Sequence, residues 1–584
     1  MEFLSLKTRS PLLKAAFREN MNNKVRILFR ILAISLAGLH AWAAITSQSM
    51  NADGIAYLDI GDAYFRADWE NAINPVWPPL YSWLLGLVNA ILKPSMVWEF
   101  PTAHIINFFI FLGAMLSFEF MWGKLGDFKS SENQNGLLSL PPWAWWAVGY
   151  SLFIWTSLSL IQIWAVTPDM LMAALLYLAA GLVIDIRNGS RKFRTFFFLG
   201  LVLGLGYLAK TFMFSIALVF LVLCLVLVYP SWKSFAKVIL STGVFLLVCL
   251  PFIFLISTKI GKLTIGEAGT VTYVRYVHGI PFPHWQGDPS NQIVLSHPSR
   301  VIHQSPLIYE FSEPIGGTYP ISTDPSYWYE GVEMRFDLGN QLARLLASSL
   351  VYLELFFQEQ GVLLACVIAL YALGQRQKYD FLGALRRWAL VIPAVTAFGL
   401  YGLVLVAGRY IGVFVLLFWA DILANIKLPE TAPHRSWLNI LSGIAILGIL
   451  VNIILFNLDG YNRLNPSTQL NVGEETASPP SWPGEVALAL HQQGVNQGDK
   501  VGIIGYGFDS FWARLARVRI VAEMLESQAN EFWLGDNDLQ QSVLQAFAST
   551  GASAVVAEYA PGYARLEGWR QVRNSNYFIY KFEE

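Results

Sequence analysis

Eleven long apolar segments constrain this chain more than any other feature of its sequence. They cover residues 28–45, 101–122, 143–164, 168–186, 196–212, 214–229, 238–257, 361–373, 388–407, 410–424 and 438–456. About 20 apolar residues in a row are enough for a helix to cross a bilayer. Hydrophobic residues make up 55% of the 584 positions and charged residues 14%, against about 25% charged in soluble domains. We therefore expect a mainly α, polytopic membrane helix bundle with about eleven transmembrane helices.

Basic residues gather in the connections on one side of these segments. The clusters are Lys7, Arg9, Lys14, Arg18, Lys24, Arg26 and Arg30; Arg187, Arg191, Lys192 and Arg194; Lys233 and Lys237; and Arg376, Lys378, Arg386 and Arg387. Connections rich in Lys and Arg stay in the cytoplasm. We expect a multi-pass protein of the cell membrane, such as a bacterial inner membrane, whose first span is retained rather than cleaved as a signal peptide.

Successive spans cross the membrane in opposite directions, and from a cytoplasmic N-terminus this predicts four parts of the chain. A basic cytoplasmic N-terminus (1–27) precedes the transmembrane domain (28–457), whose outer loops are 46–100 and 258–341. A linker (458–480) leads to an extracytoplasmic C-terminal domain (481–584). That domain reads as a small α/β unit, with helical patterns at 485–493 and 538–550 and strand patterns at 500–505, 552–557 and 577–582. The last of these alternates as an edge strand does.

The glycines of this domain do not indicate a nucleotide site. Gly502, Gly505 and Gly507 lack the order of a dinucleotide fingerprint and its acidic ribose partner. We therefore expect an accessory domain and no nucleic-acid partner. The three cysteines, Cys224, Cys249 and Cys366, lie within apolar runs and are expected to be small buried hydrophobic residues.

The long outer loop 258–341 is rich in Pro, Gly, Tyr and Trp. Loops of this length inside compact domains are usually functional or disordered. Two interpretations stay open: contact with a ligand, for which His278, His284 and Trp285 are candidates, or a lid that only covers the membrane domain.

Carboxylates stand at the outer ends of two spans. Asp53, Asp59 and Asp62 follow the first span, and Asp169 stands at the start of a later one. Charges near hydrocarbon are costly and often functional. Helical spacing predicts a short surface helix with Asp53 near its start, so Asp53 could also be an N-cap and Asp59 and Asp62 its solvated face. Asp169 beside Pro168 could equally be a carboxylate that a helix dipole stabilises.

The order of elements in the first outer loop carries a family resemblance. An aspartate, a surface helix and then Pro79-Leu80-Tyr81 leading into another short helix resemble the GT-C glycosyltransferases. Within them the chain looks most like the protein O-mannosyltransferase and aminoarabinose-transferase group (glycosyltransferase family 39 and relatives), over residues 25–460. The resemblance implies inverting transfer of a hexosyl or pentosyl group from a polyprenyl-phosphate donor, on the outer face, to an acceptor that is protein, lipid or glycan.

The same resemblance assigns roles to named residues. Asp53 matches the catalytic carboxylate, and an inverting transfer needs a base for the acceptor's proton. Asp169 matches a second acidic position, whose role in the family is to position the acceptor or to support the site. Gly54 stands where many relatives have glutamate, so a divalent metal stays possible but has no ligand motif to support it, and no other cofactor is expected.

Two cationic positions match the family's donor-phosphate site. Lys210 ends the motif Gly204-Leu205-Gly206-Tyr207-Leu208-Ala209-Lys210, and Arg409-Tyr410 matches an Arg-Tyr pair of relatives. A guanidinium can hold phosphate oxygens with two hydrogen bonds. Both cations could instead reach out to lipid headgroups without any donor site.

Two rival functions remain. A transporter or flippase of a lipid-linked glycan should show internal repeats and broken helices with polar groups near the midplane, and the sequence has no obvious repeat. A noncatalytic envelope-assembly protein would tolerate the loss of Asp53, whereas a transferase would not.

Overall fold

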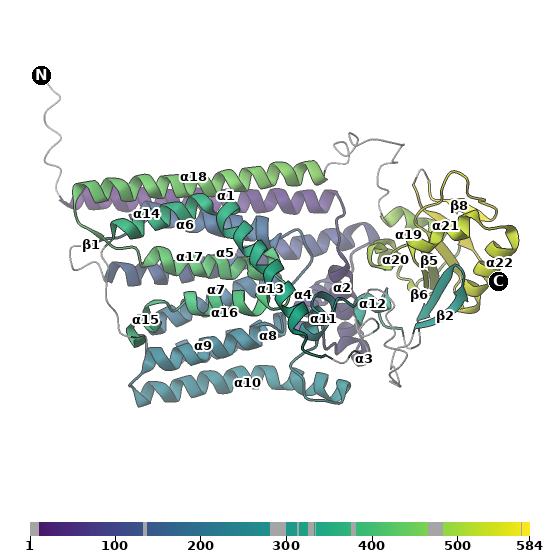
Figure 1. The fold of residues 1–584 in the computed structure, drawn as a ribbon, viewed down its shortest axis with the longest axis horizontal. Helices are drawn as coiled ribbons and strands as arrows, with labels where there is room; N and C mark the ends of the chain where they lie inside the picture. The colour runs from purple at the N-terminus through teal and green to yellow at the C-terminus, as the bar shows by residue number, and fades with distance from the viewer. Residues whose placement is uncertain are drawn as a thin grey trace, which may run out of the picture.

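A computed structural model gives the fold and describes residues 11–131, 137–280, 299–311, 313, 315–324, 327, 332, 334–374, 381–464, 483–573 and 575–583. Two parts are stacked along the long axis of the molecule, a helical bundle and a sheet domain at one end of it (Figure 1). We name the end of the bundle that carries the sheet domain the domain end, and the opposite one the far end. The expected fold class, a membrane helix bundle with a small C-terminal α/β domain, is confirmed.

Each expected span is a helix or a bent helix pair. They are α1 (Pro11–Thr46), α5 (Met96–Ser131), α6 (Pro142–Trp155) with the π-helical η2 (Thr156–Ile161), α7 (Asp169–Arg187), α8 (Phe193–Ala209), α9 (Met213–Val228), α10 (Trp232–Ile260), α13 (Leu338–Leu353) with the π-helical η4 (Glu354–Glu359) and α14 (Gly361–Leu373), α15 (Phe381–Arg387) with α16 (Val391–Gly402), α17 (Gly408–Ala424) and α18 (Ala432–Leu464). By length and composition, six of the described helices can cross a membrane, or eight if the pairs bent by 77° and 82° each form one span. This number is below the expected eleven because α8, α9 and α17 have only 17, 16 and 17 residues.

Large apolar side chains cover the outside of the bundle. Trp42 on α1 is 66% exposed, Phe109 on α5 65%, Leu247 on α10 73% and Leu447 on α18 62%. Side chains of this kind on one helix after another would be unstable in water but suit a lipid environment. The protein is a multi-pass membrane protein.

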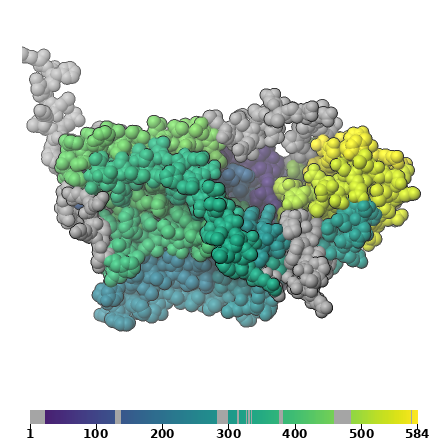
Figure 2. Space-filling view, in the orientation of Figure 1, coloured from purple at the N-terminus to yellow at the C-terminus, as the bar shows by residue number. Residues whose placement is uncertain are grey.

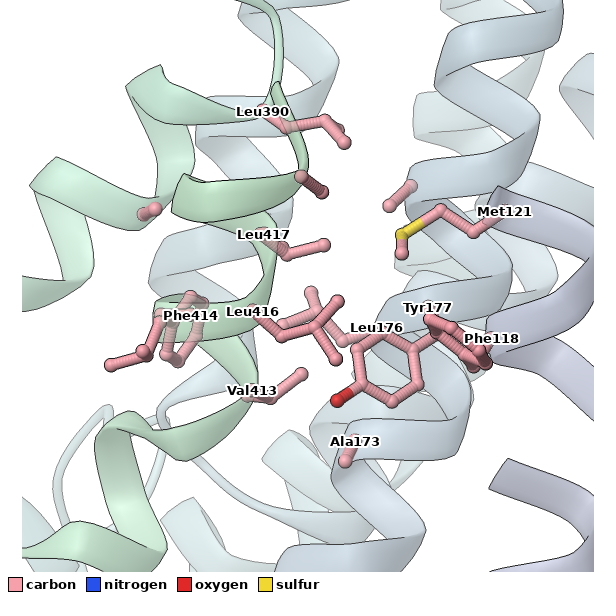
Figure 3. Close-up of a cluster of buried hydrophobic side chains, with 14 of the residues drawn as sticks. Phe118, Met121, Ala173, Leu176, Tyr177, Leu390, Val413, Phe414, Leu416 and Leu417 are labelled. Carbon is pink, nitrogen blue, oxygen red and sulfur yellow. The ribbon is translucent and has the colours of Figure 1, made fainter. Parts of the chain in front are cut away.

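The interior of the bundle is packed around α5, α7 and α17. Leu416 of α17 points toward Leu176 of α7, and Phe118 of α5 packs against the other side of Tyr177 of α7; all four side chains are fully buried (Figure 3). The three cysteines, Cys224, Cys249 and Cys366, are buried and free, as expected.

Arginines from two of the basic clusters lie together at the far end. Arg187 Nη1, at the end of α7, donates to Asp421 Oδ1 of α17 and to the Arg387 carbonyl, both at 3.1 Å. Arg386 Nη2 donates to the Tyr229 carbonyl at 2.7 Å. Since α7 and α17 are fastened together here, their first residues are held side by side at the domain end.

Three short helices form the first segment after α1. They are α2 (Ala52–Phe65), α3 (Trp69–Ala72) and α4 (Pro79–Leu92). The backbones of α2 and α4 touch where two glycines meet: a Cβ on Gly61 would lie 2.7 Å from the Ser82 carbonyl oxygen, and one on Gly86 2.6 Å from that of Gly61. The expected surface helix and the expected short apolar helix thus pack as a pair.

The C-terminal domain is built on a seven-stranded sheet in the order β2-β3-β6-β5-β7-β9-β8. The strands are β2 (Ser299–Gln304), β3 (Leu307–Phe311), β5 (Lys500–Ile504), β6 (Arg519–Met524), β7 (Ala554–Ala557), β8 (Trp569–Gln571) and β9 (Phe578–Lys581), and the helices are α19 (Pro483–Gln492), α20 (Phe511–Ala516), α21 (Glu526–Leu534) and α22 (Asn537–Ser549). Strands β6, β5 and β7 are parallel. A two-stranded pair, β1 (Leu137–Leu138) and β4 (Leu428–Pro429), lies apart from this sheet.

Two features of this sheet differ from the sequence-based prediction. The edge position expected for 577–582 was wrong, because β8 pairs outside β9 and has only three residues, too few to show a pattern. The other edge is the hairpin β2–β3, which comes from the long outer loop and packs against the domain (Figure 2). The same loop also contributes α11 (Ala268–Tyr276) and α12 (Pro320–Thr323) to the junction of the two parts.

Candidate functional site

A cavity of about 630 Å³ lies at the domain end, between the bundle and the sheet domain. Four charged residues that the sequence analysis singled out, Asp53, Asp169, Lys210 and Arg409, line it together. They come from four different segments of the chain. Because they are two carboxylates and two cations, the formal charge of this group is balanced.

Asp53 faces the cavity and forms an ion pair. It lies in the first turn of α2, whose N-cap is Asn51. The N-cap interpretation of Asp53 is therefore wrong. Its Oδ2 instead accepts a hydrogen bond from Arg409 Nη1 at 2.8 Å, and the two side chains are 30% and 32% exposed.

Asp169 forms the second pair of the cavity. It is the first residue of α7, its side chain is 2% exposed, and it is bonded to Lys210 Nζ. Lys210 directly follows α8 and keeps 19% of its side chain exposed. Both the helix-start position and an ion pair thus stabilise Asp169.

Tyr410 joins the two pairs. The Lys210 ammonium lies 3.9 Å from the centroid of its ring, a favourable arrangement for a cation over an aromatic face. Arg409 Nη2 lies 3.2 Å from the Tyr410 hydroxyl oxygen and donates to it. Tyr401 of α16 stacks on the same ring, with centroids 5.4 Å apart. The three predicted donor-site residues, Lys210, Arg409 and Tyr410, therefore form one cluster.

The cavity is lined by apolar residues on one side and by polar and aromatic residues on the other. Phe212, Leu400, Val404 and Leu405 line the side that belongs to the bundle. Arg275 and Tyr276 of α11, and Tyr506, Phe508 and Asp509 of the C-terminal domain, line the side away from it. Sequence reasoning missed these last residues because nothing in the sequence indicates which loops of a separate domain meet the bundle.

Tyr57 is a further lining residue without a predicted role. It lies one turn after Asp53 on α2, is 3% exposed and packs edge-on against Trp77 and Tyr81, with centroids 5.1 Å away in both cases. The sequence could have indicated this position, because Tyr57 is four residues after Asp53 and therefore on the same face of the helix.

The predicted substrate-loop residues are placed differently. His278 does not line the cavity and packs against Tyr273, with ring centroids 5.3 Å apart. His284 and Trp285 lie outside the described residues.

Asp59 and Asp62 are not the solvated face of α2, and that expectation was wrong. Arg514 of α20 forms ion pairs with Asp59 at 2.6 Å, with Asp62 at 2.7 Å and with Glu99 of α5 at 2.6 Å. Arg517 adds pairs with Asp62 at 2.6 Å and with Glu99 at 3.0 Å. We name these five residues the docking cluster, because they join the sheet domain to the bundle.

The centre of the docking cluster is more deeply buried than the Asp53–Arg409 pair. The side chains of Arg514, Asp59 and Glu99 are 4%, 5% and 2% exposed. Burial by itself would raise the pKa of Asp62, but Arg514 and Arg517 outweigh that effect and lower it. The Thr318 amide also donates to Asp59 Oδ2, at 2.7 Å. The docking cluster therefore fixes the position of the C-terminal domain on α2.

Among the described residues, no group of three or more His, Cys, Asp or Glu side chains is arranged to hold a metal ion.

No protein-family model and no curated protein matches this sequence. Among solved structures, the chain is similar to ArnT, an aminoarabinose transferase from Cupriavidus metallidurans. The apo form has 12% identity and a TM-score of 0.49, and the form bound to undecaprenyl phosphate 11% and 0.48; each match covers 94% of this chain and 97% of that one. It is also similar to the oligosaccharyltransferase of Archaeoglobus fulgidus in complex with Zn and sulfate, with 13% identity and a TM-score of 0.45, over 91% of this chain and 68% of that one.

Proposed function

We propose that the protein is a membrane glycosyltransferase that moves a sugar from a polyprenyl-phosphate donor to an acceptor on the extracytoplasmic face. One observation carries the proposal: two carboxylates and two cations from separate segments converge in one cavity at the domain end. A purely structural role does not require four ionic groups to line a cavity.

The proposed orientation of the protein in the membrane follows from the positions of its basic residues. Basic connections remain cytoplasmic, and those that contain Arg187, Arg191, Arg386 and Arg387 meet at the far end. The domain end, with the cavity, would then face outward. A transporter would place its polar groups near the midplane, so this arrangement favours the transferase.

In this proposal the charged residues of the cavity bind the phosphate of the donor, and its apolar residues bind the lipid chain. Arg409 and Lys210 would hold the phosphate, since charge-assisted hydrogen bonds to phosphate are strong. Leu400, Val404 and Leu405 would contact the first isoprene units, because these side chains form the apolar side of the cavity. The sugar would then lie toward Asp53 and Asp169.

Asp53 would act as the general base. The acceptor hydroxyl attacks the anomeric carbon, its proton passes to the Asp53 carboxylate, and the bond between sugar and phosphate oxygen breaks. The leaving group is a polyprenyl phosphate, whose added charge Arg409 and Lys210 stabilise. A bound phosphate would compete with Asp53 for Arg409, which makes the carboxylate more available for the proton.

The test is sugar transfer by Asp53→Asn in membranes supplied with undecaprenyl-phosphate hexoses and pentoses. We expect a loss of about 100-fold or more, because a positioned base contributes about that much, while the protein accumulates normally. Glu70→Gln, which alters an exposed carboxylate on α3, is the matched control and should transfer as the wild type does. Transfer by Asp53→Asn at the wild-type rate would refute the role of the base.

A further inference from the structure

The C-terminal domain contributes a short segment to the cavity that has no role in the steps above. Tyr506, Phe508 and Asp509 lie between β5 and α20, at the carboxyl end of a parallel strand. Ligands of α/β sheets bind at that end of the strands. The segment faces the group of Asp53, Asp169, Lys210 and Arg409 across the same cavity.

Two carboxylates, the buried Glu523 and the half-buried Glu558, hold this segment in place from behind. Glu558 Oε2 accepts a hydrogen bond from the Tyr506 amide at 2.9 Å, and its Oε1 accepts one from Ser510 Oγ at 3.0 Å. Glu523 Oε1 accepts from the Gly507 amide at 2.9 Å. The backbone is thus anchored on both sides of the residues that face the cavity.

Close packing leaves no room for a side chain at the two glycines of this segment, Gly505 and Gly507. A Cβ on Gly507 would lie 2.2 Å from the ring of Tyr319, and one on Gly505 2.3 Å from Glu558 Oε2. Tyr319 is buried and donates its hydroxyl to Glu523 Oε2 at 2.8 Å. The segment is therefore a preformed surface, as a binding site requires.

The exposed groups of the segment suit a sugar better than a phosphate. Tyr506 and Phe508 pack ring to ring with centroids 5.3 Å apart, and both line the cavity. Asp509 is exposed and has no ion pair within the part of the chain that the structure describes. Aromatic faces pack against the apolar faces of sugar rings, and a carboxylate accepts hydrogen bonds from hydroxyls. The Asp509 carboxylate of this segment would repel a phosphate.

We propose that Tyr506, Phe508 and Asp509 form a saccharide subsite opposite the proposed phosphate site. This inference rests on the proposed function and adds a binding role for the C-terminal domain. The saccharide has two sources, the sugar of the donor or a glycan acceptor. The docking cluster keeps the subsite over Asp53, because α2 carries Asp53 and two partners of Arg514, Asp59 and Asp62, while α20 follows the segment directly.

The test measures binding by the full-length protein in nanodiscs of phosphatidylethanolamine and phosphatidylglycerol. The probes are undecaprenyl phosphate, its glucose, mannose and arabinose conjugates, and a panel of free disaccharides. The variants are Tyr506→Ala and Asp509→Asn. Their controls are Tyr563→Ala and Asp538→Asn, exposed residues of the same domain outside the cavity.

We expect both variants to weaken saccharide binding by about threefold to tenfold, in keeping with one lost aromatic or hydrogen-bonding contact, with both controls unchanged. A loss confined to the sugar-bearing lipids would identify the donor sugar, and one confined to free disaccharides a glycan acceptor. Undecaprenyl phosphate itself should bind both variants as it binds the wild type.

The inference is overturned if both variants bind every saccharide probe as the controls do, or if the wild type binds no disaccharide and gains no affinity from a sugar on the lipid. Failure of the proposed function has a different signature. In that case undecaprenyl phosphate would bind the wild type no more tightly than it binds Arg409→Ala.

Discussion

Asp53 and Asp59 lie on the same short helix and have opposite surroundings. Both belong to α2, six residues and about 9 Å apart along its axis. Asp53 is 30% exposed and has one guanidinium partner at the edge of a cavity. Asp59 is 5% exposed, and Arg514 and Thr318 both donate to it. The same residue type thus serves a candidate site at the start of α2 and a domain contact in its second half.

The difference shows how to separate functional from structural charges at a membrane surface. A buried charge with several partners is costly to break and fixes geometry. A pair that faces a cavity can exchange one partner for a ligand at low cost. An ionic partner does not by itself separate a functional from a structural carboxylate, because both aspartates have one. Exposure to a cavity does separate them.

The largest effect should come from Arg514→Ala. Removing this guanidinium leaves Asp59, Asp62 and Glu99 with fewer partners, and breaking a buried pair costs about 3–5 kcal/mol. Native-state hydrogen exchange should show the amides of α20 and of the second half of α2 opening more easily by that amount. Arg517→Ala, whose side chain is 32% exposed, should cost about 1 kcal/mol or less. Equal effects of the two variants would mean that burial does not control the docking cluster.

The second effect compares two carboxylates that are both held away from water. Arginines lower the pKa of Asp62, whereas burial raises the pKa of Glu558 to about 7. Tyr506 and Ser510, which donate to Glu558, are uncharged. Between about pH 4.5 and 7 the folded protein therefore holds a proton that the unfolded chain releases, so ionisation of Glu558 costs stability as the pH rises through that window.

Glu558→Gln should remove this cost. Relative to the wild type, the variant should gain stability from pH 5 to pH 8, by about 3 kcal/mol at most. Thermal unfolding of the two proteins at several pH values measures the difference. A constant difference across this range would show that Glu558 does not titrate there.

The third prediction makes the same substitution, Asp to Asn, at Asp59 and at Asp53 and compares the effects on the opening of α20. Asp59→Asn should ease the opening of α20 by about 2 kcal/mol, because charge-assisted hydrogen bonds with Arg514 are lost. Asp53→Asn should change the same opening energy by less than about 1 kcal/mol, as expected for a partly exposed pair. Hydrogen exchange on both variants decides the matter. Equal opening energies would remove the distinction between the two aspartates.

Much of the fold could be predicted from the sequence because the apolar segments are long. Each expected span is a helix, and the patterns at 485–493, 500–505, 538–550 and 552–557 correspond to α19, β5, α22 and β7. Strand β6 was missed because it is buried on both faces, with five of its six residues inside, and shows no alternation. The hairpin β2–β3 could not be found, since its pairing with β6 joins segments about 200 residues apart.

The sequence predicted those site residues that each stand in a short motif of their own. Asp53, Asp169, Lys210 and Arg409 each stand at a helix end, and the structure brings all four to one cavity. The docking cluster was not predictable, because Arg514 and Arg517 form an ordinary pair of basic residues in a sequence that does not show what α20 touches. Asp59 and Asp62 were misread for the same reason: a helical face is solvated only if no other domain covers it.

The smallest effect is expected from Arg409→Lys, which keeps the charge of the cavity pair and changes its shape. A guanidinium can hold a phosphate oxygen while it keeps its hydrogen bond to Tyr410, whereas an ammonium is a compact point charge. Arg409 already donates to Asp53 and to Tyr410. We therefore expect the Kd for undecaprenyl phosphate to rise by about tenfold, or about 1.4 kcal/mol.

The matched control for this exchange is Arg435→Lys, in an exposed pair with Glu430 outside the cavity. Its affinity for undecaprenyl phosphate should equal that of the wild type. If Arg409→Lys also binds as the wild type does, charge alone holds the phosphate, and the orientation of the Asp53–Arg409 pair is irrelevant to the donor. A rise in Kd confined to Arg409→Lys would instead mean that the guanidinium at the start of α17, beside Asp53, recognises phosphate by its shape and not by its charge alone.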